Sequence, residues 1–226
     1  MNIIYRLCEL EADGKLRDIR PKWYTKQNCL KSFLTAVENA GDAVNKVIFV
    51  HDGDGDILLK MIPEKFQVVK IDVKDNLQSL LKTLDIADEL GLDDDIYFVE
   101  DDYLHLPDSI SEIAIAVKQL GLVNGYDHLD RYTRTDDIDY PKELKFVGNH
   151  HWRTAEATCC TYAVEKTLFK QLSPTIRAFG LWDRGLFRHF WQQLGVGLWT
   201  AVPGLTTQVD LFMSPGVDWE GFNKNV

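Results

Sequence analysis

The sequence predicts an α/β fold: a wound, mixed sheet with helices on both faces and a small extension in the second half. Short runs of consecutive apolar residues alternate along the chain with segments in which apolar residues recur at helical spacing. The run KVIFV, residues 46–50, has four apolar residues in succession, which is typical of a strand covered on both faces. Hydrophobic residues make up 45% of the 226 residues, so the chain can supply the core that such a sheet needs.

The first hundred residues follow the order strand, helix, strand, loop, strand, helix, strand. The helix expected over 28–40 has apolar side chains at Leu30, Phe33 and Val37, and Gly41 follows it. The expected strands are 2–8, 46–50, 66–73 and 96–99, and the second expected helix is 76–90. This alternation is typical of a parallel sheet wound with helices.

The second half has a different pattern, which we interpret as a mixed or antiparallel extension of the sheet. Its expected strands are 123–126, 145–151, 157–164 and 195–202, and its expected helices are 108–120, 165–178 and 183–194. Residues 131–141 are polar and show no apolar period. No repeat or low-complexity tract divides the chain, so we expect one domain over 1–226, made of the halves 1–104 and 105–226.

Composition and charge exclude several partners. The formal net charge is −10, from 35 acidic and 25 basic residues, whereas a nucleic-acid-binding protein needs a basic face to neutralise phosphates. No apolar run approaches the ~20 residues that cross a bilayer, and the first residues lack the apolar region of a signal peptide. The four cysteines show no CxxC spacing, which favours reduced thiols. We therefore expect a cytoplasmic protein with no nucleic-acid partner and no transmembrane segment.

Charged residues follow three of the expected strands at the point where each strand ends. They are Arg6, the pair His51 and Asp52, and the triplet Glu100–Asp102 in the stretch YFVEDDYLH. Ligands of wound parallel sheets bind just beyond the carboxyl ends of the strands, so these side chains should converge on one site. Carboxylates at such an edge suit a hard divalent cation that also binds substrate phosphates. The alternative is a solvated acidic turn, although apolar residues flank the triplet on both sides.

The segment HDGDGD, residues 51–56, resembles a calcium loop only superficially. An EF-hand loop that begins at Asp52 needs Glu at its twelfth position, which is Pro63 here, and a loop that begins at Asp54 reaches Lys65. Two interpretations remain: a glycine-rich turn, or a loop whose Asp52 accepts hydrogen bonds from a nucleoside.

Two pairs of potential zinc ligands occur in the second half. His150 and His151 are adjacent, as are Cys159 and Cys160, and neither pair has a standard zinc spacing. Adjacent ligands cannot easily reach one tetrahedral centre, so we do not predict zinc. His150 and Trp152 suit the wall of a binding pocket better, because an aromatic face fits the apolar face of a sugar ring.

The segment GLWDRGLFRHFW, residues 180–191, combines a turn with the start of an expected helix. Asp183 lies at that start, where an aspartate commonly caps the helix. It could also serve as a general base at the mouth of a pocket, with Trp182 beside it. The two roles are compatible.

Together these motifs resemble those of GT-A glycosyltransferases, especially small family-two-like enzymes of bacteria and their viruses. HDGDGD resembles the DDGS-type loop after the second strand, and VEDD is similar to the DxD-type metal motif in an EDD form. WDRGLF resembles the acidic helix start that supplies the base in inverting members. PGLTTQVD resembles a late loop in which relatives often have a histidine; this chain has Gln208 there, a weaker metal ligand.

The resemblance implies a GT-A-like, Rossmann-like domain and a hexosyltransferase-type reaction. A sugar would pass, with inversion, from a UDP- or GDP-sugar bound by residues 1–104 to a hydroxyl of a glycan or other acceptor bound by 105–226. Asp102 would bind Mn²⁺ or Mg²⁺ directly, with Glu100 and Asp101 in support. The other implied site residues are Arg6 and Asp52 for the nucleotide, Asp183 as base, and His150, Trp152, Trp182 and Gln208 as pocket wall.

Other classes of protein fit the sequence less well. A nucleotidyltransferase usually has a glycine-rich phosphate loop soon after its first strand, but CELEADGKLRDIRP contains one glycine. A phosphohydrolase needs paired aspartates there. The main alternative is a nucleotide-sugar-binding or interaction domain without catalysis.

Overall fold

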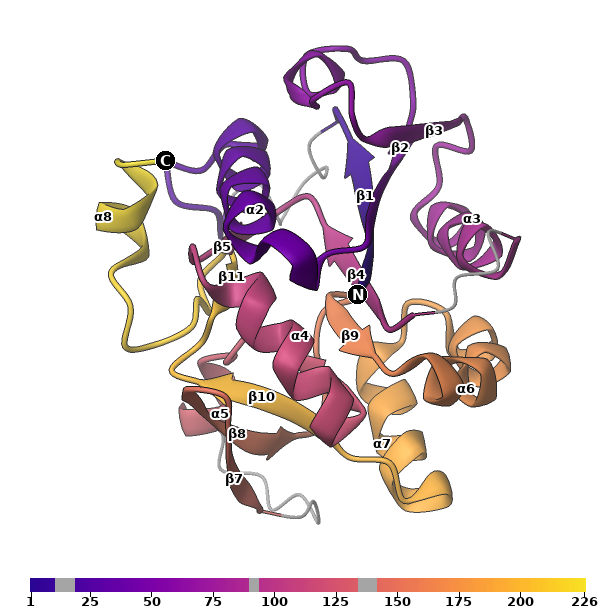
Figure 1. Cartoon of the computed structure of the whole chain (residues 1–226), viewed down its shortest axis with the longest axis vertical. Helices are drawn as coiled ribbons and strands as arrows, with labels where there is room; N and C mark the ends of the chain where they lie inside the picture. The colour runs from indigo at the N-terminus through magenta and orange to yellow at the C-terminus, as the bar shows by residue number, and fades with distance from the viewer. Residues whose placement is uncertain (11–18, 90–93, 134–141) are drawn as a thin grey trace.

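The computed structural model describes residues 1–10, 19–89, 94–133 and 142–226 (Figure 1). A nine-stranded mixed sheet, in the order β3-β2-β1-β4-β9-β6-β10-β8-β7, runs through both halves of the chain. Its strands are β1 (Asn2–Cys8), β2 (Lys46–Asp52), β3 (Gln67–Ile71), β4 (Ile96–Glu100), β6 (Leu122–Asn124), β7 (Leu144–Val147), β8 (His150–Ala155), β9 (Tyr162–Val164) and β10 (Leu198–Val202). The predicted α/β class and mixed sheet are therefore confirmed.

The helices of eight or more residues connect these strands. They are α2 (Lys26–Ala40), α3 (Asn76–Glu89), α4 (Ser109–Leu120), α6 (Lys166–Phe179) and α7 (Asp183–Leu194). Shorter elements are α5 (Asp130–Thr133), α8 (Trp219–Asn223) and the 3-10 segments Gly41–Ala43 and Leu59–Met61. The predicted helices over 28–40, 108–120, 165–178 and 183–194 match α2, α4, α6 and α7 within two residues.

The first half forms the parallel part of the sheet. β1 pairs in parallel with both β2 and β4, and β2 pairs in parallel with β3. The register places Arg6 beside Glu100 and Cys8 beside Asp52, so the carboxyl ends of these three strands meet at one edge.

The second half is antiparallel in most of its pairings. β9 pairs antiparallel with both β4 and β6, and β8 pairs antiparallel with β10 and with β7. The strand expected over 145–151 is wrong in its extent, because Gly148 takes a positive φ of 61° and turns the chain between β7 and β8. The strand expected over 157–164 is also shorter, since only its last three residues pair as β9.

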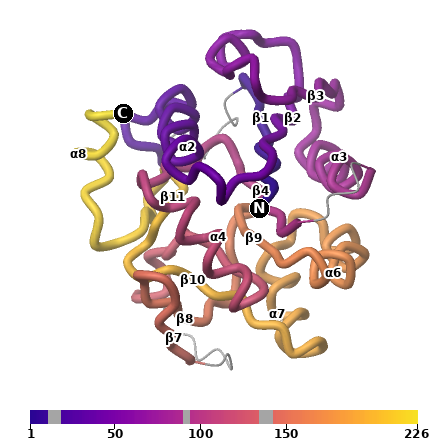
Figure 2. Tube along the Cα trace, viewed as in Figure 1, coloured from indigo at the N-terminus to yellow at the C-terminus, as the bar shows by residue number. Residues whose placement is uncertain are grey.

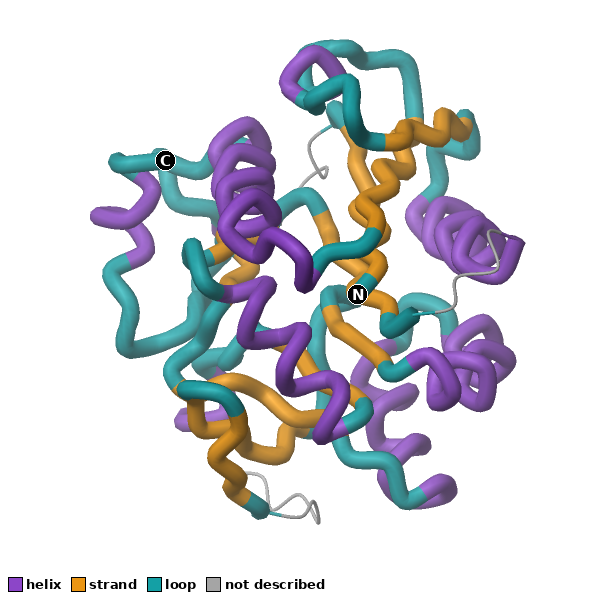
Figure 3. The backbone as a smooth tube through the Cα atoms, in the orientation of Figure 1, coloured by secondary structure: helices purple, strands orange, loops and turns teal. Residues whose placement is uncertain are grey.

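Helices cover both faces of the sheet (Figures 1 and 3). Alternating side chains of β1 point to opposite faces: Ile3, Tyr5 and Leu7 pack with α2 and α4, whereas Ile4 packs in the cluster that contains residues of α3, α6 and α7. A run of consecutive apolar residues is therefore buried on both sides, as its composition predicts.

A second layer joins the end of the chain to the first half. β5 (Tyr103–His105) and β11 (Thr206–Gln208) form a two-stranded antiparallel sheet in which Gln208 lies opposite Tyr103. Beyond it, α8 returns to the beginning of α2 (Figure 2), where Asn28 Nδ2 donates to Asn223 Oδ1 at 3.1 Å. Among the described residues, no helix has both the length and the apolar character to cross a bilayer.

Candidate functional site

A cleft of about 560 Å³ opens at the carboxyl ends of β1, β2 and β4. The structure brings seven of the ten predicted site residues to it. They are Arg6, Asp52, Glu100, Asp101, Asp102, Asp183 and Gln208. The same cleft is lined by Arg20, Lys26, Lys74, Asn76 and the thiols of Cys8, Cys159 and Cys160. Residues far apart in the chain thus share one site because parallel strands end at the same edge.

Arg6 and Glu100 form an ion pair on the floor of the cleft. Arg6 Nη2 donates to Glu100 Oε2 at 2.7 Å, and Nε donates to both carboxylate oxygens. Nη1 donates to the carbonyl and side-chain oxygens of Asn76 at 2.9 and 2.6 Å, which ties β1 to the start of α3. Burial raises the pKa of Glu100 to about 7, and the neighbouring Arg6 opposes that rise. The pair therefore joins three elements of the scaffold.

Lys26 and Asp101 form the second pair, at the end of β1. The buried Lys26 ammonium donates to Asp101 Oδ2 at 2.9 Å and to the carbonyl oxygens of Cys8 and Leu10 at 2.7 and 2.8 Å. Asp101 Oδ2 also accepts from the Cys8 amide at 2.7 Å. Burial raises the pKa of Asp101, whereas Lys26 lowers it. These contacts hold the chain that leaves β1 against the start of α2.

Asp102 differs from the other two acids of the triplet. Its Oδ2 accepts from Arg20 Nη2 at 2.8 Å and from Gln208 Nε2 at 3.0 Å. Its Oδ1 is buried and has no hydrogen-bond partner in the described part of the chain. A buried carboxylate oxygen without a donor is costly to an isolated protein. The cleft thus contains one strong acceptor that a ligand can satisfy.

The unpaired Oδ1 of Asp102 is an oxygen ligand of the kind that a hard divalent cation prefers. Within the ranges that the structure describes, no three His, Cys, Asp or Glu side chains are arranged to hold a metal ion. Mg²⁺-like ions are commonly bound by one or two carboxylates, with water and substrate phosphates supplying the remaining ligands. Asp102 Oδ1 meets that requirement, and the side chain of Gln208 lies beside it.

Asp52 supports the opposite rim of the cleft. Its Oδ1 accepts from the backbone amides of Val73 and Lys74 at 2.9 and 3.1 Å. Lys74 has a positive φ of 50°, which is uncommon for a residue other than glycine. The loop of Asp52 also needs Gly55, because a Cβ there would lie 1.9 Å from the Glu9 side chain. HDGDGD is thus a glycine-dependent turn whose first aspartate faces the cleft.

Asp183 comes to the cleft from the second half of the chain. It is the first residue of α7, and its Oδ1 accepts from the amide of the next residue, Arg184, at 2.6 Å. Burial raises the pKa of Asp183 above its ordinary value, against the lowering effects of that amide and of nearby cations. A carboxylate with a raised pKa accepts a proton more readily, which suits a general base.

Cys159 and Cys160 lie beside Asp183 in the lining of the cleft. Cys160 has a φ of 57°, and the amide of Thr161 donates to the Cys159 carbonyl at 2.7 Å across it. This is the geometry of a tight three-residue turn. Burial raises the pKa of both thiols, so they remain protonated and weakly nucleophilic at neutral pH.

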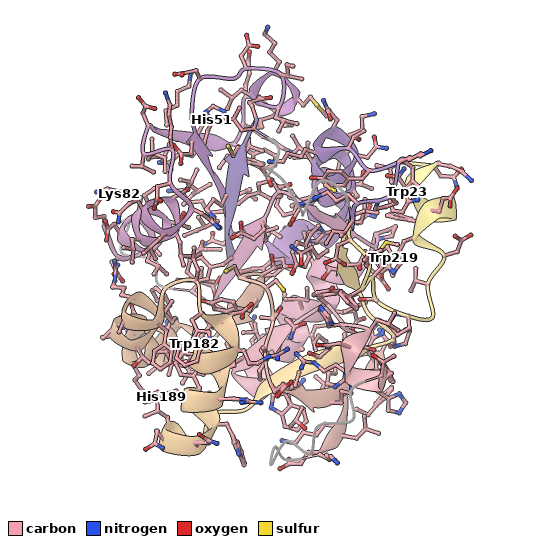
Figure 4. The ribbon with its side chains drawn as sticks, turned by 180° about the vertical axis from the view of Figure 1, so that it is seen from behind. Trp23, His51, Lys82, Trp182, His189 and Trp219 are labelled. Atoms are coloured by element: carbon pink, nitrogen blue, oxygen red, sulfur yellow. The ribbon has the colours of Figure 1, made fainter. Side chains whose placement is uncertain are left out.

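Three predicted residues lie away from this lining. Trp152 is fully buried in the core and its indole donates to the Val147 carbonyl at 3.1 Å, so the prediction that it forms a pocket wall is wrong. His150, at the start of β8, is not in the cleft lining. Its Nε2 lies 3.9 Å from Asp108 Oδ2. Trp182, which Figure 4 labels, is 68% exposed. It stacks on Phe179 and follows the cleft residue Leu181 in the chain.

Arg20 and Lys26 are cleft residues that the sequence analysis missed. Both lie in or beside the polar segment between β1 and α2. A signal was available: RPKWYTK, residues 20–26, concentrates cations in the connection between the first expected strand and the first expected helix, and wound sheets bind their ligands at such connections.

Comparison with known proteins gives a likeness of fold. No protein-family model matches the chain, and no curated protein matches its sequence. The crystal structure of Rv0371c from Mycobacterium tuberculosis H37Rv superposes with a TM-score of 0.52 at 15% identity. The match covers 100% of this chain and 99% of that chain, so the similarity concerns the whole architecture.

Proposed function

We propose that the protein is a GT-A-type glycosyltransferase that moves a sugar from a nucleoside-diphosphate donor to an acceptor hydroxyl, with inversion. One observation carries the proposal: the strand-end acids and Asp183, from opposite halves of the chain, line one cleft. The cleft volume of about 560 Å³ is in the range of small-molecule sites. The buried, unsatisfied Oδ1 of Asp102 supports a role in holding the charged part of the donor.

Each cleft residue then has a stated task. Asp102 would hold Mn²⁺ or Mg²⁺, and a bound cation would supply stabilisation of the negative charge on the diphosphate. Asp52, whose loop forms the rim, contacts the nucleoside. Asp183 removes the proton of the acceptor hydroxyl as that oxygen attacks the sugar, and its raised pKa suits this step. Arg6, Glu100 and Asp101 hold the floor in place.

A panel of UDP- and GDP-sugars with Mn²⁺ and simple sugar acceptors tests the proposal. The measured quantity is release of nucleoside diphosphate together with the glycosylated product. Asp183→Asn should lower transfer by about 10²–10⁴-fold, the usual contribution of a general base, while donor affinity measured by calorimetry stays close to that of the original protein. Asp56→Asn, an exposed change outside the cleft lining, is the control and should transfer normally.

Other outcomes favour other functions. Donor binding without turnover for any donor and acceptor would indicate a nucleotide-sugar-binding domain without catalysis, consistent with Gln208 at the place where relatives often have a histidine. No binding of any nucleotide would indicate an interaction domain. Transfer that survives in Asp183→Asn would limit Asp183 to its place at the start of α7.

A further inference from the structure

The contact between Arg20 and Asp102 connects a segment outside the sheet with the acid that faces the ligand. Arg20 Nη2 lies 2.8 Å from Asp102 Oδ2, and the two side chains are only 10% and 11% exposed. The same oxygen accepts from Gln208, so it is fully engaged while Oδ1 is not. We propose, on the basis of the proposed function, that Arg20 neutralises Asp102 while the cleft is empty and thereby opposes cation binding. When the donor enters, Arg20 binds its diphosphate instead.

The opposition follows from charge. A divalent cation at Asp102 would lie close to the Arg20 guanidinium, and both side chains are about nine-tenths buried. Like charges repel strongly under those conditions. Arg20 also supplies part of the neutralisation that a cation would otherwise supply. Without a nucleotide, Mn²⁺ or Mg²⁺ therefore competes with Arg20 for the same carboxylate.

A diphosphate reverses this balance. It brings at least two negative charges, and the planar guanidinium is the side chain best suited to bind phosphate oxygens with two hydrogen bonds. Once the diphosphate accepts hydrogen bonds from Arg20, Asp102 is available to the cation. Nucleotide and cation then bind cooperatively, because each removes an unfavourable contact of the other.

The guanidinium remains at the cleft during this exchange because Tyr24 holds it. Arg20 Cζ lies 4.2 Å from the centroid of the Tyr24 ring, a cation–π contact. Tyr24 packs in turn against the cluster of Cys29, Leu104, Val209 and Trp219 at the start of α2. Figure 4 shows the neighbouring Trp23 close to Trp219 in this region.

Other cleft cations are tied to the scaffold. Arg6 is held by Glu100 and Asn76, and Lys26 by two backbone carbonyls and Asp101. Removing either would disturb the floor itself. Arg20 instead contacts the one triplet acid that retains a buried oxygen for a ligand, which is why the exchange is assigned to it.

The test measures two affinities of Arg20→Gln by calorimetry: Mn²⁺ alone, and UDP or GDP alone in the presence of EDTA. Mn²⁺ should bind more tightly than to the original protein, and the metal-free nucleotide should bind more weakly, each by about tenfold or more, because a charged hydrogen bond is removed in each case. Arg177→Gln is the matched control: it removes an arginine that pairs with Asp85 and Asp88 outside the cleft lining, and should change neither affinity.

Two further variants complete the experiment. Asp102→Asn should lose Mn²⁺ binding but bind metal-free nucleotide at least as tightly as the original protein, because the Asp102 carboxylate no longer competes with the diphosphate for Arg20. If Arg20→Gln does not fold, as judged by its thermal unfolding, Arg20→Lys replaces it. The lysine keeps the charge and loses the planar fork, so nucleotide affinity should fall without the gain in Mn²⁺ affinity.

The outcomes are distinct from failure of the glycosyltransferase proposal. Loss of both affinities in Arg20→Gln would show that Arg20 only holds the cleft together, and unchanged affinities would show that it does nothing there; either result overturns this inference even if sugar transfer is observed. Absence of nucleotide binding to the original protein overturns the proposed function, and this inference with it.

Discussion

The two walls of the cleft differ in how their side chains are held. The wall from the parallel half is built from side chains with several partners each: Arg6 with Glu100 and Asn76, and Lys26 with Asp101 and two carbonyls. The wall from the second half is less constrained. Asp183 accepts a hydrogen bond from the amide of its own neighbour, Arg184.

The difference indicates that the side chains of the parallel half are structural, whereas Asp183 is free to take part in proton transfer. Side chains that share buried ion pairs with two or three elements cannot leave them without a large loss of stability. They suit a fixed floor for the proposed nucleotide. Asp183, by contrast, has a raised pKa and a local partner, so it can take up and release a proton without disturbing the sheet. The comparison predicts that substitutions in the two walls have different effects.

The largest effect is expected for Lys26→Met in the parallel half. The change leaves the Asp101 carboxylate and two carbonyls without their common donor. Removal of one member of a buried pair should lower the free energy of unfolding by about 3–5 kcal/mol, which urea denaturation measures. Lys60→Met is the control, because Lys60 and its partner Asp56 are 72% and 62% exposed and the pair should contribute little. Equal losses of unfolding free energy in Lys26→Met and Lys60→Met would contradict a structural role for the Lys26 contacts.

A smaller effect is expected for Asp52→Ala at the rim. The amides of Val73 and Lys74 lose a charged acceptor, so the free energy of unfolding should fall by about 1–3 kcal/mol. Asp52→Asn keeps an oxygen in the same place and should recover most of the loss. Guanidinium denaturation of both variants makes the comparison. If Asp52→Asn lowers the free energy of unfolding as much as Asp52→Ala does, the negative charge of Asp52 rather than its hydrogen bonds stabilises the turn.

The smallest effect concerns the proton affinity of Asp183 in the other wall. Burial raises its pKa and Arg184 lowers it. Removing that charge in Arg184→Gln, which retains the backbone amide, should therefore raise the pKa of Asp183 further. The proposed base acts as the carboxylate, so under the proposed function the acidic limb of the pH–rate profile should move to higher pH. Carboxyl-carbon NMR titration measures the shift independently of activity.

The control for this prediction is Lys46→Gln. Lys46 begins β2 at the opposite end of the strands from the cleft, so its loss should leave the Asp183 titration where it was. An equal shift in both variants would mean that net charge, rather than the contact at the start of α7, sets the pKa. An unchanged Asp183 pKa in Arg184→Gln would show that the charge of Arg184 does not affect that pKa.

The parallel half could be predicted from the sequence because its signals are local. Consecutive apolar residues identify β1, β2 and β4, and their polar ends identify one edge of the sheet. The second half depends on distant pairings. Residues 157–161 look like the beginning of a strand, but Thr158 and Cys159 make hydrogen bonds within their own turn, so only Tyr162–Val164 pairs.

Errors in the candidate site have a related cause. Trp152 has the composition of a pocket wall, yet its burial is decided by the strands beside β8, which no short motif reveals. Arg20 was missed because its partner, Asp102, is 82 residues away in the chain. Sequence patterns identify which residue types end a strand, whereas the neighbour of each side chain depends on the completed fold.

The position of β9 has a consequence for the biosynthesis of the protein. β9 is inserted between β4 and β6, which both precede it in the chain. While a ribosome extends the chain, the facing edges of β4 and β6 therefore stay open until residue 164 has left the exit tunnel. Open strand edges are templates for pairing with other chains. The nascent protein thus passes through a stage at which chaperone protection matters most, and translation pauses before residue 164 would prolong that stage.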